Sequence, residues 1–496
     1  MSRFKSALVA TALVGALFTT SACTTAPAGG GPILAFGSVE DDVRIGREAH
    51  PQILAQYGGS IGDPAIERYV QRIGTGLGNV SELSELDFTF TVLDSEVVNA
   101  FALPGGYVYV TRGLMALAED EAELAGVIGH EIGHVTARHG ASRQATGTLL
   151  TAGLGLLGVI GGAYLGGQTG ADLGGQAGQA IGYGLTMTYS RGQEYEADAL
   201  GVRYLDRAGY DPTAMATFLE ALQTSAELQA KIAGVSLERG AIDHFFSSHP
   251  DAPDRVARAR EAARNTGSSS TRRDRDALLD QLDGMIYGQS PAQGFVLGQR
   301  FAHPALRLEF VYPEGYRVIN QPDAVVGRGE NRFLVFDLEE AERATNPRQY
   351  LEREWVENGS LRDVSTFRTA NGLDAAVGYA QMQLSGRPAQ AGLVAIAGAD
   401  RTFYRFIVIA GQIGRAERNH LRSAVDSFRR LSPAEAAELR PQRIRLVTVQ
   451  PGDTIDGFAR QMQVDELPRE HFVTLNGLDR GRELVPGERV KIIVRG

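Results

Sequence analysis

Two histidines and a glutamate in one short apolar run have the spacing of a metal-binding helix. His130 and His134 are four residues apart, and Glu131 follows the first histidine directly. On an α-helix, residues four apart lie one above the other on the same face, so both imidazoles can bind one metal ion. Glu131 would then lie within reach of a water on that ion. The pattern predicts a helix that begins at Asp120 and ends near His139.

A second stretch offers two carboxylates with the same helical spacing, Glu194 and Asp198. A catalytic zinc site uses three protein ligands and keeps one position for water. Glu194 would complete a His-His-Glu set for one zinc ion per chain, and Asp198 would accept the remaining N–H of a ligating histidine. Glu131 would act as the base that takes a proton from the attacking water and delivers it to the leaving amine. Spacing alone leaves open whether the two helices meet.

His249 and Arg255 lie at the start of a third predicted helix, around a turn rich in proline. They could stabilise the oxyanion of a tetrahedral intermediate, or His249 could occupy the open zinc position in a resting state. The alternative is a helix-capping turn without chemistry. His139 is five residues past His134 and points to a different helical face, so we expect it at the surface or beside a ligand.

The elements around these residues are partly readable. A helix is expected from Pro64, with Asp63 as its cap and proline in the first turn. The run Tyr107–Thr111 predicts a strand, either an ordinary sheet strand or an edge strand that pairs with an extended peptide. The glycine-rich stretch 147–185 predicts two helices packed through small residues, or a hairpin that touches a membrane surface.

Composition excludes one class of partner. Of 496 residues, 43% are hydrophobic and 22% are charged, which is typical of globular proteins. The net charge of −10 argues against nucleic acid, because phosphate binding requires clustered basic residues. The length favours about three domains.

The N-terminal residues predict export. Arg3 and Lys5 precede an apolar run, Ala7–Phe18, of the length of a secretory signal. Cys23 is the only cysteine, so no intrachain disulfide can form. Its position behind small residues resembles a bacterial lipobox, although Thr20 stands where an aliphatic residue is usual. The resemblance implies acylation of Cys23 and an outer-membrane lipid anchor in the periplasm; ordinary cleavage to a soluble periplasmic protein is the alternative.

Taken together, the motifs resemble a zinc metallopeptidase family. The order His130-Glu131-x-x-His134, Glu194-x-x-x-Asp198 and His249 to Arg255 is similar to the gluzincin family that holds the CAAX prenyl protease, HtpX and BepA-like periplasmic proteases. The run 99–106, Asn-Ala-Phe-Ala-Leu-Pro-Gly-Gly, also matches that family. The resemblance implies zinc ligation by both motif histidines and Glu194, with Glu131 as the catalytic base. It also favours Tyr107–Thr111 as an edge strand.

The chain after residue 264 has weaker resemblances. The tail from Ile444 is similar to a LysM module, a βααβ unit that binds peptidoglycan, although Pro468 and a few extra residues interrupt its middle. Packing or protein contacts are the alternative role for that module. The region 286–432 resembles PsbP-like α+β domains.

These observations predict an α+β multidomain protein. We expect a mainly α-helical zincin-type peptidase domain with a small sheet, then an α+β PsbP-like domain and a βααβ LysM-like module. The expected division is a signal peptide 1–22, a lipid-anchored linker 23–38, the metallopeptidase domain 39–264, a linker 265–275, the accessory domain 276–432, a linker 433–443 and the module 444–496.

The expected function is zinc-dependent cleavage of protein or peptide substrates in the bacterial envelope, in quality control of misfolded or misassembled proteins. Two alternatives remain at this point. One is a chaperone or scaffold whose metal site is inhibited by His249. The other is a hydrolase directed at peptidoglycan.

Overall fold

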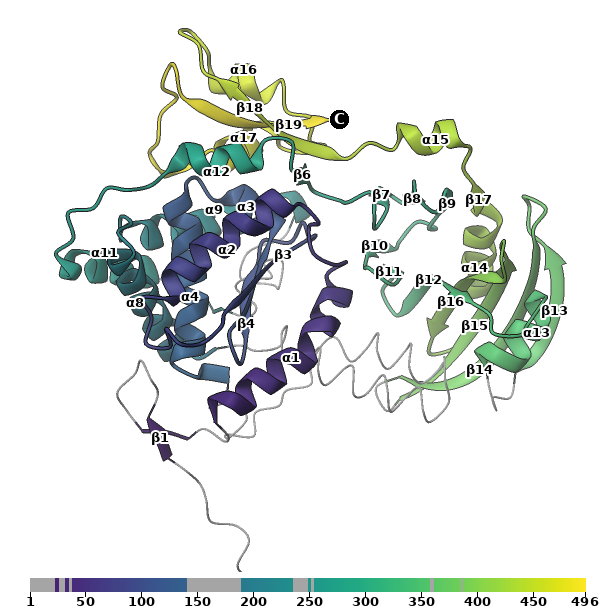
Figure 1. Ribbon diagram of the computed structural model, residues 1–496. Helices are drawn as coiled ribbons and strands as arrows, with labels where there is room; N and C mark the ends of the chain where they lie inside the picture. Colours follow the sequence, from purple (N-terminus) through teal and green to yellow (C-terminus); the bar gives the residue numbers. More distant parts are fainter. Residues whose placement is uncertain are drawn as a thin grey trace, which may run out of the picture.

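The computed structural model divides into a helical part, a sheet-rich part and a small C-terminal unit (Figure 1). This mixed, multidomain α/β architecture is the one expected in outline. Residues 1–22, expected to be a signal peptide, and the glycine-rich stretch 147–185 lie outside the described residues. Among the described helices, none is both long and apolar enough to span a bilayer. The structure describes residues 23–25, 32–34, 38–140, 189–234, 249–250, 254–356, 361–384 and 387–496.

Helices dominate the first part of the chain. Asp63 caps the second helix, where its carboxylate accepts from the Ala65 N–H at 2.8 Å, and Pro64 occupies the first turn as predicted. Asp120 caps the fourth in the same way, through the Glu123 N–H at 2.8 Å. The helices are α1 (Val39–Gln56), α2 (Pro64–Gly78), α3 (Arg112–Leu117), α4 (Glu121–Thr136), α8 (Arg191–Arg207), α9 (Ala214–Ala233), α11 (Arg255–Thr266) and α12 (Arg275–Leu282).

A three-stranded sheet lies beside α4. It consists of β3 (Thr89–Leu93), β4 (Ala100–Leu103) and β5 (Tyr107–Thr111) in the order β3-β5-β4. Strand β5 pairs in parallel with β3 and antiparallel with β4, so both of its edges are occupied. The expectation that Tyr107–Thr111 forms an edge strand is therefore wrong. The edge strands are β3 and β4, and β4, which the Pro104–Gly106 turn folds back along β5, is the one that packs most closely against α4.

Small residues let α4 and α8 cross at close range. A Cβ atom on Gly201 of α8 would lie 3.0 Å from the His130 backbone nitrogen and 2.3 Å from the Met215 Cε atom. On the α4 side, a Cβ atom on Gly133 would meet the Ala197 carbonyl at 3.2 Å. Only glycine fits such a crossing without a shift of backbone. The close contact brings the histidine face of α4 against the carboxylate face of α8.

The sheet-rich part contains a seven-stranded sheet, order β10-β11-β12-β16-β15-β14-β13, and a four-stranded sheet, order β17-β9-β8-β7. Separate apolar cores cover the two faces of the larger sheet, one under α14 and one around Tyr350 and Trp355. The elements are β7 (Phe295–Leu297), β8 (Arg300–His303), β9 (Leu308–Val311), β10 (Arg317–Asn320), β11 (Val325–Arg328), β12 (Arg332–Glu340), α13 (Pro347–Tyr350), β13 (Arg362–Arg368), β14 (Asp374–Leu384), β15 (Arg387–Ala397), β16 (Thr402–Ala410), α14 (Arg415–Ser427) and β17 (Arg429–Arg430).

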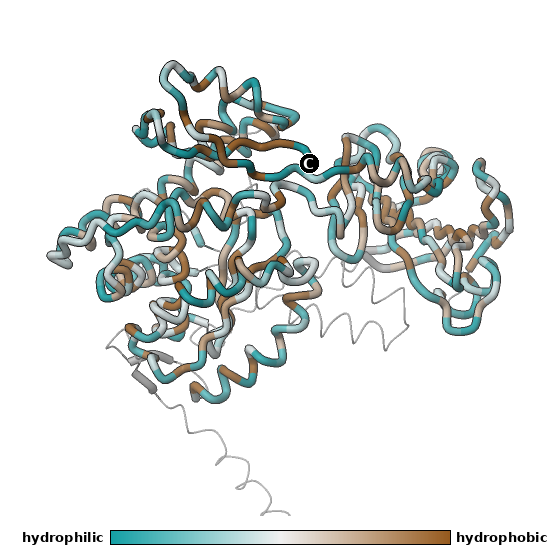
Figure 2. The backbone as a smooth tube through the Cα atoms, turned by 45° about the horizontal axis from the view of Figure 1, so that its top comes forward, coloured by the Kyte–Doolittle hydropathy of each residue, from teal (hydrophilic) through white to brown (hydrophobic). Residues whose placement is uncertain are grey.

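The C-terminal unit, residues 442–496, follows the short helix α15 (Pro433–Glu438) and packs against the helical part (Figure 1). Its strands pair antiparallel, and β6 (Ile286–Tyr287) joins them as a third strand. Hydrophobic residues run along its last strand (Figure 2). Its apolar residues belong to the same core as those of α4 and α9. The unit comprises β18 (Gln442–Thr448), α16 (Ile455–Ala459), α17 (Pro468–Leu475), the 3-10 turn Leu478–Arg480 and β19 (Arg489–Arg495).

Two short strands precede α1. They are β1 (Cys23–Thr25) and β2 (Pro32–Leu34), paired antiparallel.

Substitution of Gly201 by valine tests the close crossing of α4 and α8. The added side chain has no room, so we expect a loss of about 1–3 kcal/mol in the free energy of unfolding. Displacement of α8 would also move Glu194 and Asp198, so we expect weaker zinc binding. Thermal unfolding and zinc titration measure both effects. Gly192→Ala on the same helix is the matched control, because no atom lies closer than 3.9 Å to its added Cβ. Equal stability of G201V and wild type would contradict the close crossing.

Candidate metal centre

Four side chains from α4, α8 and the segment before α11 meet in one buried cluster. They are His130, His134, Glu194 and His249, and each is at most 2% exposed. One ligand atom from each lies within 4.8 Å of the others. The structure therefore brings together the three predicted ligands, and it places His249 beside them.

Four distances within the cluster are close to those between the corners of a tetrahedral site. The two motif imidazoles place their Nε2 atoms 3.0 Å apart, and the His134 Nε2 atom lies 3.4 Å from Glu194 Oε1. His249 Nδ1 lies 3.3 Å from His130 Nε2 and 3.2 Å from Glu194 Oε1. Ligands bound to zinc at about 2.0–2.1 Å in tetrahedral geometry are separated by about 3.4 Å. The cluster fits a zinc ion in size and in donor type.

Charge also favours a divalent cation at this place. Glu131, Glu194 and Asp198 are each at most 2% exposed, and Arg255, at 1%, is the cation paired with two of them. Buried charges are costly unless they are paired. Three carboxylates against one guanidinium leave two negative charges when the histidines are neutral, and a zinc ion balances them.

Glu131 lies in this cluster as expected of a base. Its Oε1 atom is 3.5 Å from His249 Nε2, and among the described residues neither of its carboxylate oxygens has a hydrogen-bond partner. Burial raises the pKa of Glu131 above its ordinary value, against the lowering effect of His249 and His130. A carboxylate with a raised pKa is better matched to accepting a proton near neutral pH.

Asp198 and Arg255 contact the predicted ligands His130 and Glu194 and fix their positions. His130 Nδ1 lies 2.9 Å from Asp198 Oδ1, which fixes the ring so that Nε2 faces the cluster. Arg255 donates to both oxygens of Asp198 at 2.8 Å, and its Nη1 atom lies 2.9 Å from Glu194 Oε2. Burial opposes ionisation of Asp198, but Arg255 and His130 keep its pKa below the ordinary value. Arg255 thus contacts both α8 carboxylates, whereas an oxyanion contact was one of its expected roles.

His134 has partners that the sequence pattern did not show. Its Nδ1 atom lies 2.7 Å from His139 Nδ1, and His139 Nε2 lies 3.3 Å from Glu196. Helix α4 ends at Thr136, earlier than expected, and the left-handed φ of 51° at Arg138 turns the chain back toward His134. His139 therefore lies buried beside a ligand, which was one of its two expected places.

Tyr189 is the site residue that sequence reasoning missed. Its ring stacks on the His134 imidazole with centroids 3.6 Å apart and an angle of 15° between the planes. It immediately precedes Ser190, the N-cap of α8, and this adjacency to the second motif is the one signal that could have indicated it.

His249 lies just before α11, in the turn rich in proline. The N-cap of that helix is Asp254, five residues further along the chain. The His249 Nδ1 atom lies at the fourth corner of the cluster.

A small pocket of about 20 Å³ lies beside His134. It lies between the end of β4 with the following turn, at Leu103 and Pro104, and the end of α4, and Tyr189 forms part of its wall. Arg138 contributes a guanidinium that pairs with Asp42 at 2.9 Å. The pocket therefore adjoins both the metal cluster and the edge strand.

The part of the chain that contains the metal centre is similar to known metallopeptidases. Residues 64–263 match the model of peptidase family M48. The chain is 30% identical over 206 residues to the beta-barrel assembly-enhancing protease of Escherichia coli, covering 41% of this chain and 40% of that protein. Its match to the protein of that name from Yersinia pestis is 31% over 223 residues, 44% and 43% of the two chains. A mitochondrial metalloendopeptidase of Schizosaccharomyces pombe is 28% identical over 226 residues, 45% of this chain and 61% of that protein.

The chain thus spans less than two thirds of the length of these relatives. Among solved structures, PsbP from Synechocystis aligns with a TM-score of 0.20 and 13% identity, covering 28% of this chain and 98% of that one. That score is too low to carry an argument, so the PsbP-like and LysM-like resemblances stay predictions. The family match and the buried cluster together support the expected zinc metalloendopeptidase with one zinc ion.

Replacement of Asp198 by asparagine tests how His130 is held. The amide keeps the shape but loses the charge that orients the imidazole and pairs with Arg255. We expect zinc affinity to fall about 10- to 100-fold. Competition with a chromophoric chelator measures it, and Asp206→Asn on the same helix is the matched control. Unchanged zinc affinity in D198N would show that this carboxylate does not position the ligand.

Proposed function

Because residues 64–263 match the model of peptidase family M48, we propose that this chain is a zinc metalloendopeptidase that cleaves proteins of the bacterial envelope. The observation that carries the proposal is the buried cluster of His130, His134 and Glu194 with tetrahedral spacing, beside the carboxylate of Glu131. These three ligands would hold one zinc ion. When bound, zinc activates water for attack and polarises the scissile carbonyl.

The chain's own residues supply the remaining steps. Glu131 takes the proton from the attacking water and transfers it to the leaving amine. Asp198 and Arg255 keep His130 and Glu194 in place, while Tyr189 and His139 do the same for His134. Preorganised ligands need no rearrangement at the moment of reaction.

Strand β4 provides the surface for an extended substrate. It is an edge strand of its sheet and packs against α4. A peptide added antiparallel to an edge strand gains main-chain hydrogen bonds with little dependence on sequence. Such binding suits unfolded or misassembled proteins, and the names of the bacterial relatives support a role in envelope protein quality control.

The finer features belong to the same proposal. We propose the domain division expected from the sequence, with export by residues 1–22, an outer-membrane anchor at Cys23 and a periplasmic location; strand β6, within the expected accessory region, pairs with the C-terminal unit. The accessory region 276–432 has a PsbP-like fold, and the module 444–496 has a LysM-like fold. Peptidoglycan is the candidate ligand of that module.

His249 sets the resting state of the site. Its imidazole occupies the fourth corner of the cluster, at 3.2 Å from Glu194, where a substrate or water would enter. In this state the enzyme is closed, and substrate binding has to displace the segment that carries His249. The closed corner also favours the second candidate, a chaperone that binds clients without cutting them.

Substitution of Glu131 by glutamine separates the protease from the chaperone. The amide cannot accept the proton, so we expect cleavage of an unfolded test protein to fall by about 10²-fold or more, with zinc content unchanged. Gel-based cleavage assays and metal analysis measure both, and substitution of the exposed Glu227 of α9 by glutamine is the control. A chelator should abolish the wild-type activity, and added zinc should restore it. Equal cleavage by wild type and E131Q would refute the proposed chemistry.

Replacement of His249 by alanine tests the closed resting state. If the open state is populated about one tenth of the time, removal of the imidazole should raise the cleavage rate of a short peptide about tenfold. Initial rates at low peptide concentration provide the measurement. A decrease in rate would instead assign His249 to stabilisation of the transition state.

A further inference from the structure

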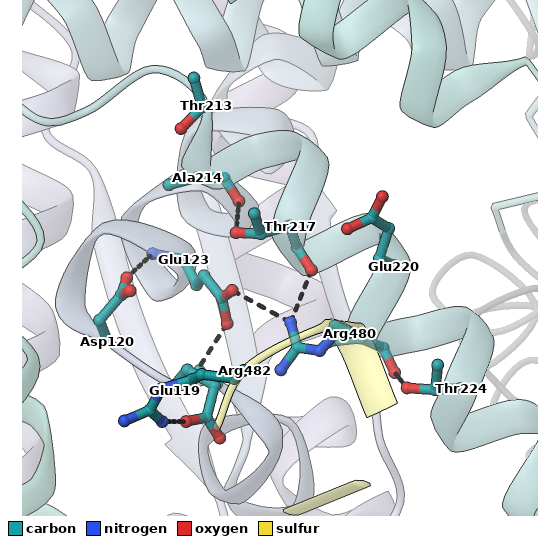
Figure 3. Close-up of polar contacts among 12 residues, drawn as sticks. Glu119, Asp120, Glu123, Thr213, Ala214, Thr217, Glu220, Thr224, Arg480 and Arg482 are labelled. Atoms are coloured by element: carbon teal, nitrogen blue, oxygen red, sulfur yellow. Dashed lines mark hydrogen bonds and ion pairs between the residues drawn. The ribbon is translucent and has the colours of Figure 1, made fainter. Parts of the chain in front are cut away.

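Basic residues of the C-terminal unit contact the start of α4, at Glu123 in its first turn and at Glu119 just before its N-cap. Arg480 Nη1 lies 3.2 Å from Glu123 Oε1 and donates to the Thr217 carbonyl of α9 at 2.7 Å (Figure 3). Arg482 Nη1 donates to Glu119 Oε2 at 2.7 Å. The residues that form the first of these pairs are 357 positions apart in sequence. These contacts connect α4 to the C-terminal unit.

Lys491 makes the third contact, and it is the most deeply buried. Its ammonium group is inaccessible to solvent and lies 3.0 Å from Glu119 Oε1. It also donates to the carbonyl groups of Ala116 and Ala118 at 2.9 Å each, at the end of α3. Burial would raise the pKa of Glu119, but Lys491 and the nearby arginines lower it below the ordinary value. A buried ammonium needs all of these acceptors, so it requires the docked position of β19.

Apolar packing extends the same interface. Phe472 and Leu475 of α17 and Ile492 of β19 share one continuous core with α3, α4 and α9. A Cβ atom on Gly477, which precedes the turn that carries Arg480, would lie 3.3 Å from the Glu119 side chain. The interface therefore resembles the interior of a domain more than a transient surface contact.

The held turn lies on the metal-binding helix itself. Glu123 precedes His130 by seven residues, two helical turns or about 10 Å along the axis. Every residue of α4 is buried, so the helix moves as a packed rod. Its other end is tied by the pair between Arg138 and Asp42. A displacement at the first turn is therefore transmitted to the imidazoles.

We propose that the C-terminal unit is an intramolecular clamp on α4, and that Arg480 and Lys491 are positioning residues for the metal centre. The proposal rests on the proposed function for its consequence in catalysis, while the clamp itself concerns the position of the helix. It assigns to the unit a partner within the chain, the start of α4, through Glu123 in the first turn and Glu119 just before the N-cap. Glycan binding by the unit is a separate property.

The full-length protein allows a direct test with Arg480→Met, Arg480→Lys and Lys491→Met. Arg495→Met is the matched control, because Arg495 lies in the same unit but pairs with the exposed Asp465. We expect R480M and K491M to speed amide hydrogen exchange in α4 and to lower zinc affinity about 2- to 30-fold, the usual range for residues that act at a distance. R480K, which keeps the charge, should recover most of both losses, and R495M should match wild type.

Three results would overturn the proposal. They are exchange in α4 and zinc affinity as in wild type, faster exchange with wild-type zinc affinity, or losses in R495M as large as those in R480M. If K491M does not fold, the comparison of R480M with R480K still decides. Failure of the proposed function would look different, because wild-type protein would then show no cleavage while the exchange difference in α4 persisted.

Discussion

The salt bridges that Arg255 makes with Glu194 and Asp198 of α8 are the interactions on which the rest of the site depends. They hold Glu194 and Asp198 together in a region without solvent access, and Asp198 in turn orients His130. One guanidinium cannot neutralise these carboxylates and Glu131 together. The remaining negative charge destabilises the folded, metal-free protein unless histidines take up protons or a divalent cation binds. Metal binding and the stability of this interior are therefore linked.

Such a site also requires accurate placement of two helices. The glycine crossing at Gly201 sets the distance between α4 and α8, and the C-terminal unit fixes α4 along its axis through Glu119 and Glu123. The edge strand β4 then lies beside the cluster. These constraints come from segments separated by hundreds of residues, which explains why the centre is buried in a shared core rather than exposed in a loop.

Local patterns predicted the centre itself well. The spacing of four between His130 and His134, and between Glu194 and Asp198, is a property of a single helix, so sequence alone could show it. The resemblance of the motifs to one family supplied the pairing of the two helices. His139 was harder to place, because its contact depends on an early helix end and a left-handed residue that periodicity does not reveal. Tyr189 carries no periodic signal, and the central position of β5 follows from long-range strand pairing. The contacts of Lys491 with Glu119 are equally long-range, so the sequence pattern predicted the tail as a separate module.

The central claim is that one zinc ion is held by a nitrogen and oxygen cluster built from α4, α8 and His249. X-ray absorption spectroscopy of the zinc-loaded, full-length protein tests it most directly. The account predicts one zinc per chain with only nitrogen and oxygen neighbours at about 2.0–2.1 Å and the scattering pattern of imidazole rings, reduced in a His134→Ala variant. Protein that binds no stoichiometric zinc, or a zinc environment unchanged in that variant, would contradict it.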